Sequence, residues 1–129
     1  MSSDMYREVI IDHYKNPHYK GELDNHTHSH HDKNPLCGDE LTIQLIVDEN
    51  DVIQQAMHNG RGCAISQATA DLLVSDIIGR NVEDVKALDK DDLLELLGIE
   101  LGPVRMKCAL LSLQVLKGSL YMGAVGADE

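Results

Sequence analysis

Hydrophobic residues recur along this chain with two different periods, which predict one helix, a small sheet and then several more helices. From Asp4 to Lys15, apolar and aromatic positions are spaced three or four residues apart, as on one face of an α-helix. The expected face comprises Tyr6, Val9, Ile10, His13 and Tyr14. Asn16 and Pro17 end this helix, because proline lacks the N–H that would bond to the preceding turn.

Residues 18–36 show neither period. They contain five histidines, several Asp, Asn and Glu residues, and few apolar ones, so we expect a loop. A loop of this length in a compact domain usually has a function.

Over 41–47 the apolar residues Leu41, Ile43, Leu45 and Val47 alternate with Thr42 and Gln44, which predicts a strand with one buried face. Residues 48–51 are all polar and predict a turn, so residues 52–58 are expected to form an antiparallel partner strand. The sequence Asn-Gly-Arg-Gly at 59–62 is expected to be a flexible connector in front of Cys63.

The helical period returns after this connector. We expect helices over 64–78, 82–88, 90–97 and 104–117. In the first of these, Gln67 and Asp71 fall opposite the apolar stripe, while Asn81 and Asp89 are candidate N-caps of the next two. Strands followed by helices predict an α+β domain, a single one over 1–129, with helices packed on one face of the sheet.

Composition and charge narrow the class of protein. The 129 residues are 43% hydrophobic, enough for one packed core, although Phe and Trp are absent. Asp and Glu outnumber Lys and Arg by 22 to 11, and the formal net charge of −11 repels nucleic-acid phosphates and anionic membranes. No apolar run reaches the roughly 20 residues that span a bilayer, and the N-terminus lacks the apolar core of a signal peptide. We therefore expect a soluble cytoplasmic protein that binds neither nucleic acid nor membrane.

Three cysteines carry the strongest chemical signal. An odd number cannot pair completely within one chain, so we expect free thiols in a reducing compartment. Cys37 lies in a turn before the first strand, Cys63 just before a helix, and Cys108 near the start of the last helix. Helix N-termini and neighbouring cations favour the thiolate, which is the form that binds metals and attacks electrophiles.

Asp39 would complete a set of four ligands with these cysteines. It follows Cys37 by two residues, and Gly38 between them permits a tight turn that brings both side chains to one side. Three thiolates and one carboxylate match the four ligands of tetrahedral zinc, and the sulfur-rich set also suits iron–sulfur chemistry. Since no CxxC pair is present, three unrelated cysteines remain the alternative on spacing alone.

Histidines form a second group of metal-binding side chains: His26, His28, His30 and His31. Such a cluster can bind zinc or nickel, which gives the alternative function of a metal buffer. Its polar surroundings favour solvated side chains instead. His58 is expected to be a surface histidine at the end of a strand.

Four stretches of the chain together resemble a known family. They are MYREVIIDHY at 5–14, NPLCGDE at 34–40, GRGCAISQATA at 60–70 and RMKCALLSLQVLK at 105–117. In content and order they are similar to the IscU/SufU proteins, the NifU N-terminal type of iron–sulfur cluster assembly protein. The likeness implies an α+β, SufE/NifU-like fold in which an antiparallel sheet of about three strands packs against several helices.

The resemblance also implies a function and a site. Cys37, Asp39, Cys63 and Cys108 would bind zinc, or else iron or a transient [2Fe–2S] cluster. The protein would accept persulfide sulfur from a cysteine desulfurase and serve apo iron–sulfur proteins or downstream carriers, as a sulfurtransferase-like acceptor or scaffold rather than a conventional enzyme. Proteins that resemble SufU have a lysine before the third cysteine, as Lys107 is here, and their acceptor would be Cys37; an IscU-like mechanism would use Cys108.

Two features depart from these relatives. Gly102 stands where IscU has the first proline of its chaperone-binding LPPVK segment. SufU-like proteins usually have an insertion between the second and third cysteines, but here this stretch is closer in length to that of IscU. The alternative to sulfur transfer is an interaction module with a permanent structural zinc.

Overall fold

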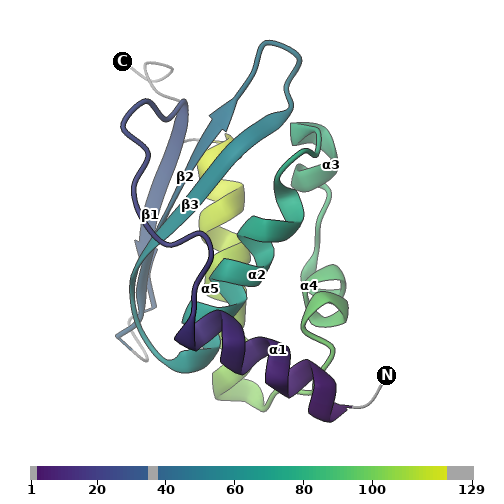
Figure 1. Ribbon diagram of the computed structural model, residues 1–129. Coiled ribbons are helices and arrows are strands. Elements are labelled where there is room, and N and C mark those ends of the chain that lie inside the picture. Colours follow the sequence, from purple (N-terminus) through teal and green to yellow (C-terminus); the bar gives the residue numbers. More distant parts are fainter. Residues whose placement is uncertain (1–2, 35–37, 122–129) are drawn as a thin grey trace.

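The computed structural model of the protein describes residues 3–34 and 38–121 (Figure 1). Its elements in chain order are α1 (Ser3–Lys15), β1 (His28–Lys33), β2 (Glu40–Val47), β3 (Ile53–Arg61), α2 (Ala64–Ile77), α3 (Val82–Lys86), α4 (Lys90–Leu97) and α5 (Pro103–Tyr121). This order of strands and helices confirms the predicted α+β class.

The three strands form one antiparallel sheet in the order β1-β2-β3. In the central strand Leu41, Ile43 and Leu45 are buried, while the residues between them are partly exposed, so the predicted alternation is confirmed. α2 and α5 pack against one face of the sheet, and α3 and α4 lie on the far side of these two helices (Figure 1). Each fully buried Leu or Ile in this core contributes about 1.5–3 kcal/mol relative to an exposed one.

Strand β1 lies inside the segment for which the sequence predicts a loop, so that prediction is wrong for His28–Lys33. β1 pairs with β2, and His28 lies opposite Leu45. The pairing needs no apolar sequence, because its hydrogen bonds come from backbone N–H and C=O groups. On the α5 side, the ring of His30 lies so close to Gly118 that a Cβ there would come within 2.4 Å of it. A glycine in α5 thus makes room for a polar strand.

β3 is longer than predicted. It continues through Arg61, so most of the expected flexible connector is strand. Gly60 makes this possible, because a Cβ at that position would lie 2.2 Å from the carbonyl oxygen of Glu40 on β2.

The helix boundaries agree closely with those expected from the sequence. The Asn81 side chain caps α3 by accepting from the N–H of Glu83 at 2.9 Å. Asp89 caps α4 through reciprocal bonds with Asp92, and Gly98 ends that helix with a left-handed φ of 69°. Within the described ranges, none of the helices combines the length and apolar character needed to cross a membrane.

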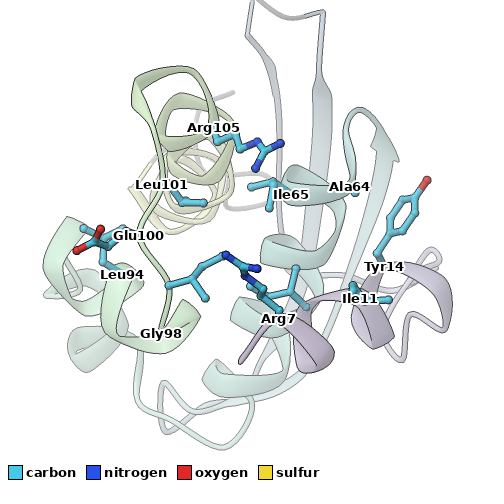
Figure 2. A pocket seen from close by; sticks show the side chains of 12 residues that line it. Arg7, Ile11, Tyr14, Ala64, Ile65, Leu94, Gly98, Glu100, Leu101 and Arg105 are labelled. Atoms are coloured by element: carbon cyan, nitrogen blue, oxygen red, sulfur yellow. The ribbon is translucent and has the colours of Figure 1, made fainter. Parts of the chain in front are cut away.

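α1 forms as predicted, but its buried face differs from the expected one. Ile10 is buried, whereas Val9 and Tyr14 are 42% and 47% exposed. α1 packs against α2 through Ile10, and its neighbouring side chains line an open groove of about 1050 Å³ (Figure 2). The apolar residues of α1 therefore line a surface groove as well as packing into the core.

Candidate metal centre

Asp39, Cys63 and Cys108 lie together at the end of the sheet where β2 begins and β3 ends. One carboxylate oxygen and the two Sγ atoms are all within 4.8 Å of one another. One ion can contact all three, because zinc lies about 2.0–2.3 Å from oxygen and sulfur ligands. The fold thus brings together three candidate ligands that are far apart in the sequence.

Cys63 owes its place to the start of α2. It is the N-cap residue, with extended backbone (φ −69°, ψ 168°), and its Sγ accepts from the backbone N–H of Ser66 at 3.5 Å. The Ser66 hydroxyl donates in return to the carbonyl of Cys63 at 3.1 Å. These contacts fix the sulfur at the positive end of the helix dipole, which favours a negatively charged group.

Asp39 is held directly against Cys63. Its Oδ1 accepts from the N–H of Cys63 at 3.2 Å, and its Oδ2 lies 3.7 Å from the Cys63 Sγ. The carboxyl group is 3% exposed and packs on Gly62, where an added Cβ would come within 2.6 Å of it. Gly62, which the sequence suggested was part of a flexible connector, is therefore required for the close approach of a ligand.

Cys108 lies in the second turn of α5 and is 3% exposed, whereas Cys63 is exposed. Cys108 is therefore buried with the side chains of the core, although it lies near the start of its helix. The centre is consequently covered by α5 on one side and open to solvent at Cys63.

The fourth predicted ligand, Cys37, lies outside the described residues, as do its neighbours Pro35 and Leu36. Gly38 is described, and its φ of 73° has the left-handed value that the predicted tight turn needs. Its N–H donates to the carbonyl of Asn34 at 2.9 Å, which holds these two residues together just before Asp39.

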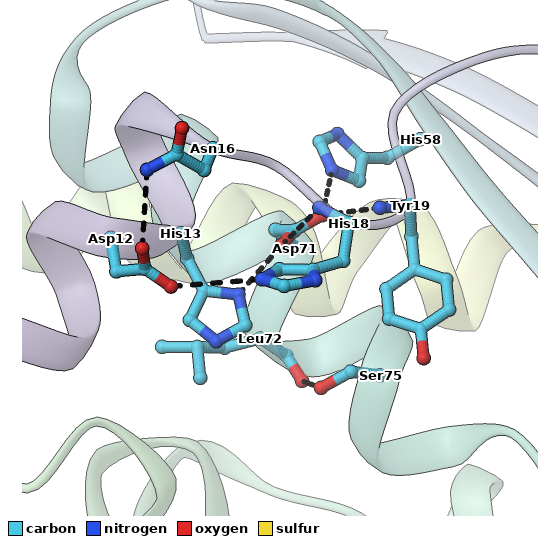
Figure 3. A network of polar contacts seen from close by, with 9 residues as sticks. All are labelled: Asp12, His13, Asn16, His18, Tyr19, His58, Asp71, Leu72 and Ser75. Carbon is cyan, nitrogen blue, oxygen red and sulfur yellow. Dashed lines mark hydrogen bonds and ion pairs between the residues drawn. The ribbon is translucent and has the colours of Figure 1, made fainter.

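His58 and Asp71 are both buried, against the prediction of a surface histidine and a polar outer face on α2. The Oδ1 of Asp71 accepts from Nε2 of His58 and from the N–H of Tyr19, each at 2.9 Å (Figure 3). Its Oδ2 accepts from Nδ1 of His13 at 2.6 Å and from the N–H of His18 at 3.1 Å. One carboxylate thus ties α1, the segment after it, β3 and α2 together.

Burial opposes ionisation of Asp71, but the hydrogen bonds outweigh it and hold the pKa of this carboxyl below its usual value. Desolvation lowers the pKa of His58, and its bond to Asp71 offsets this only in part. His58 is therefore neutral at neutral pH, and its Nδ1 has no partner among the described residues. No spacing in the sequence links these side chains, so only the fold reveals the network.

The other histidines gather on β1 and just before it, not on a solvated loop. His26, His28 and His30 are half-buried, and only His31 is exposed. His26 bonds to the carbonyl of Leu23 at 2.8 Å, and His28 to the hydroxyl of Thr27 at 2.9 Å. Across the described part of the chain, the only group of three or more metal-binding side chains that converge is Asp39, Cys63 and Cys108.

Comparison with known proteins identifies the family to which the chain belongs. Residues 5–123 match the family model of the NifU-like N-terminal domain. The chain belongs to this NifU-like family, which includes IscU and SufU. It is 35% identical to the zinc-dependent sulfurtransferase SufU of Bacillus subtilis, over 88% of this chain and 87% of that protein. It is 34% identical to the iron–sulfur cluster assembly scaffold protein IscU of Thermotoga maritima, over 90% and 92%.

A solved structure supports the same assignment. The FiSufU protein of Fervidobacterium islandicum superimposes with a TM-score of 0.73 at 28% identity, covering 93% of this chain and 99% of that one. The resemblance drawn from the four motifs and the predicted fold are thereby confirmed. As a NifU-like domain, the chain places three of its four expected ligands at one point.

Proposed function

We propose that this protein takes part in iron–sulfur cluster assembly by accepting persulfide sulfur from a cysteine desulfurase at a site formed by Cys37, Asp39, Cys63 and Cys108. The observation that carries the proposal is the convergence of Asp39, Cys63 and Cys108 within 4.8 Å. The similarity to a zinc-dependent sulfurtransferase and to cluster assembly scaffolds supports it.

The donor set fits zinc. Thiolate and carboxylate groups are both zinc ligands, and a fourth ligand from Cys37 would give the tetrahedral number. Asp39 is the hard ligand among soft sulfurs, so it is the one most readily displaced by an incoming group. An assembling [2Fe–2S] cluster is cargo of the same site rather than a permanent part of it.

In the proposed sulfur transfer, a cysteine thiolate attacks the outer sulfur of the desulfurase persulfide. A new S–S bond forms on this protein, the S–S bond of the desulfurase breaks, and the desulfurase cysteine leaves as a thiolate. Cys37 is the proposed acceptor, with Cys108 as the alternative. The 3% exposure of Cys108 argues against it as the first acceptor, because exchange requires access to the attacking sulfur. Lys107, in place of a histidine, agrees with the SufU-like variant.

Persulfide mapping tests the acceptor. The protein is incubated with a cysteine desulfurase and cysteine, and each cysteine-containing peptide is analysed by mass spectrometry. We expect the additional sulfur on Cys37, and Cys37→Ser should abolish it. Sulfur on neither Cys37 nor Cys108 would exclude the proposed mechanism, and unchanged desulfurase turnover would favour the structural-zinc module.

Metal analysis tests the ligand set. Protein purified without oxygen should contain one zinc and be colourless, or contain two irons and be brown. Cys63→Ser should lose the metal, while Asp76→Ala on the exposed side of α2 should retain it. Metal that survives Cys63→Ser but is lost when residues 26–31 are deleted would instead support the histidine metal buffer.

A further inference from the structure

The groove beside α1 contains two arginines that have no ion-pair partner among the side chains that the structure describes. Figure 2 shows the side chains of Arg7, from α1, and Arg105, from α5, both pointing into it, while Glu100 at the opposite wall points away. Among the side chains of residues 7–34 and 38–121, neither guanidinium has a carboxylate within ion-pair distance, whereas Arg61 and Arg80 each have one. Two unpaired cations at one groove are notable in a chain of net charge −11.

Apolar surface continues outward from the groove. Ile11 and Tyr14, which line it, are 51% and 47% exposed, and Val104, next to Arg105, is 70% exposed. Single exposed apolar residues are ordinary, but several of them around an open groove indicate a protein interaction site. The groove is open and its apolar rim extends past it, which suits a protein segment better than an enclosed small molecule.

The groove adjoins the metal centre. Ala64 and Ile65, which line it, directly follow Cys63 in the chain. Arg105 precedes Cys108 by three residues on α5, which is one helical turn. A segment bound in the groove would therefore hold its own protein beside the exposed sulfur of Cys63.

We propose that this groove docks a segment of the sulfur-donor protein in which carboxylates alternate with apolar side chains. The identity of the partner rests on the proposed function, and the chemistry of its segment rests on the groove. The guanidinium groups of Arg7 and Arg105 can each bind a carboxylate in bidentate geometry. The overall negative charge repels an acidic segment from most of this protein's surface, so the two arginines also orient its approach. The same repulsion disfavours a second copy of this chain as the occupant.

Charge reversal tests the electrostatic half of the proposal. Binding to the cysteine desulfurase of the same organism is measured by surface plasmon resonance without cysteine, so that no sulfur is transferred. The double variant Arg7→Glu/Arg105→Glu should lower the association rate constant by about tenfold or more and weaken its salt dependence. The control Lys33→Glu/Lys90→Glu changes the net charge equally at exposed sites away from the groove and should have less than about a twofold effect.

Two exposed residues of α1 test the apolar half. Ile11 lines the groove and Val9 does not, although both are exposed β-branched residues of the same helix. Ile11→Ser should raise the Kd by about tenfold, whereas Val9→Ser should leave it within about twofold. A photo-crosslinking amino acid at Tyr14 should capture a desulfurase peptide that contains both carboxylates and apolar residues.

Several outcomes would overturn the proposal. Equal loss of binding in both charge variants, or a crosslinked peptide rich in Lys and Arg, would exclude an acidic segment as the occupant. Self-association that Arg7→Glu/Arg105→Glu abolishes would identify a second copy instead. If the wild-type protein accepts sulfur and both double variants bind normally, the docking site is wrong and the proposed function stands. If the wild-type protein neither binds the desulfurase nor accepts sulfur, both are wrong.

Discussion

Replacing Asp71 should destabilise this protein more than replacing any other polar residue of α2. Its carboxylate accepts from two imidazoles and two backbone N–H groups while being fully buried. Asp71→Ala leaves all four donors without that acceptor. The cost of the change depends on which donors can reach water instead.

The loss of unfolding free energy can be estimated from the exposure of each hydrogen-bond donor. The His58 side chain is 1% exposed, so the loss of its acceptor costs about 1–3 kcal/mol. The His13 side chain is 15% exposed. His13 and the backbone N–H groups of His18 and Tyr19 can replace their lost hydrogen bonds with bonds to water only in part. We therefore expect Asp71→Ala to lower the free energy of unfolding by about 3–5 kcal/mol.

Asp71→Asn should be milder. An amide oxygen at the Oδ1 position keeps the bonds from His58 and Tyr19. The amide nitrogen at the Oδ2 position can donate to His13 once that ring changes tautomer, but it leaves the N–H of His18 without an acceptor. One lost backbone bond predicts a cost of about 1–2 kcal/mol.

Urea unfolding of the metal-free protein, followed by far-UV circular dichroism, measures these differences. Asp76→Ala is the matched control, because Asp76 lies on the same helix, is 41% exposed and pairs with Arg80 at the surface. It should cost less than about 0.5 kcal/mol. If Asp71→Ala costs no more than Asp76→Ala, the network does not stabilise the fold and the reasoning fails.

Three further changes test other parts of the structure. Because folding lowers the pKa of His58, the unfolded chain binds more protons than the folded chain once the pH falls below the usual histidine value of 6.5. The free energy of unfolding should therefore decrease by up to about 1.4 kcal/mol for each unit by which the pH is lowered in that range. A His58→Gln variant with the same pH dependence would contradict this. Gly62→Ala should displace the Asp39 carboxylate and weaken zinc binding by about tenfold in a chelator competition titration, whereas Gly102→Ala, with open space around it, should not. Asp89→Ala removes the cap of α4 and should cost about 1 kcal/mol in urea unfolding; Asp89→Asn should restore most of it, and equal losses would argue against capping.

The residue types of the candidate site could be predicted from the sequence, but the contacts and burial of those residues could not. Residue type and position near the start of a strand or helix grouped Asp39, Cys63 and Cys108 with Cys37 as candidate ligands, and the family resemblance implied the same set. The sequence did not indicate that Gly62 must lack a Cβ for Asp39 to reach Cys63, because that contact joins the residue before β2 to the residues after β3. It also did not indicate that Cys108 is buried, since a helix start alone does not reveal what covers it.

By itself, the sequence determined the elements that depend on neighbouring residues: the alternating strand β2 and the capped helices α3 and α4. Hydrophobic period and capping are local, so a short stretch of chain suffices to specify each. The tertiary structure alone decided that polar β1 becomes a strand, that His58 shares a buried carboxylate with His13, and that Arg7 and Arg105 face one groove. Those outcomes depend on which distant groups supply hydrogen bonds, exclude water or leave a charge unpaired, and only the folded chain brings these groups together.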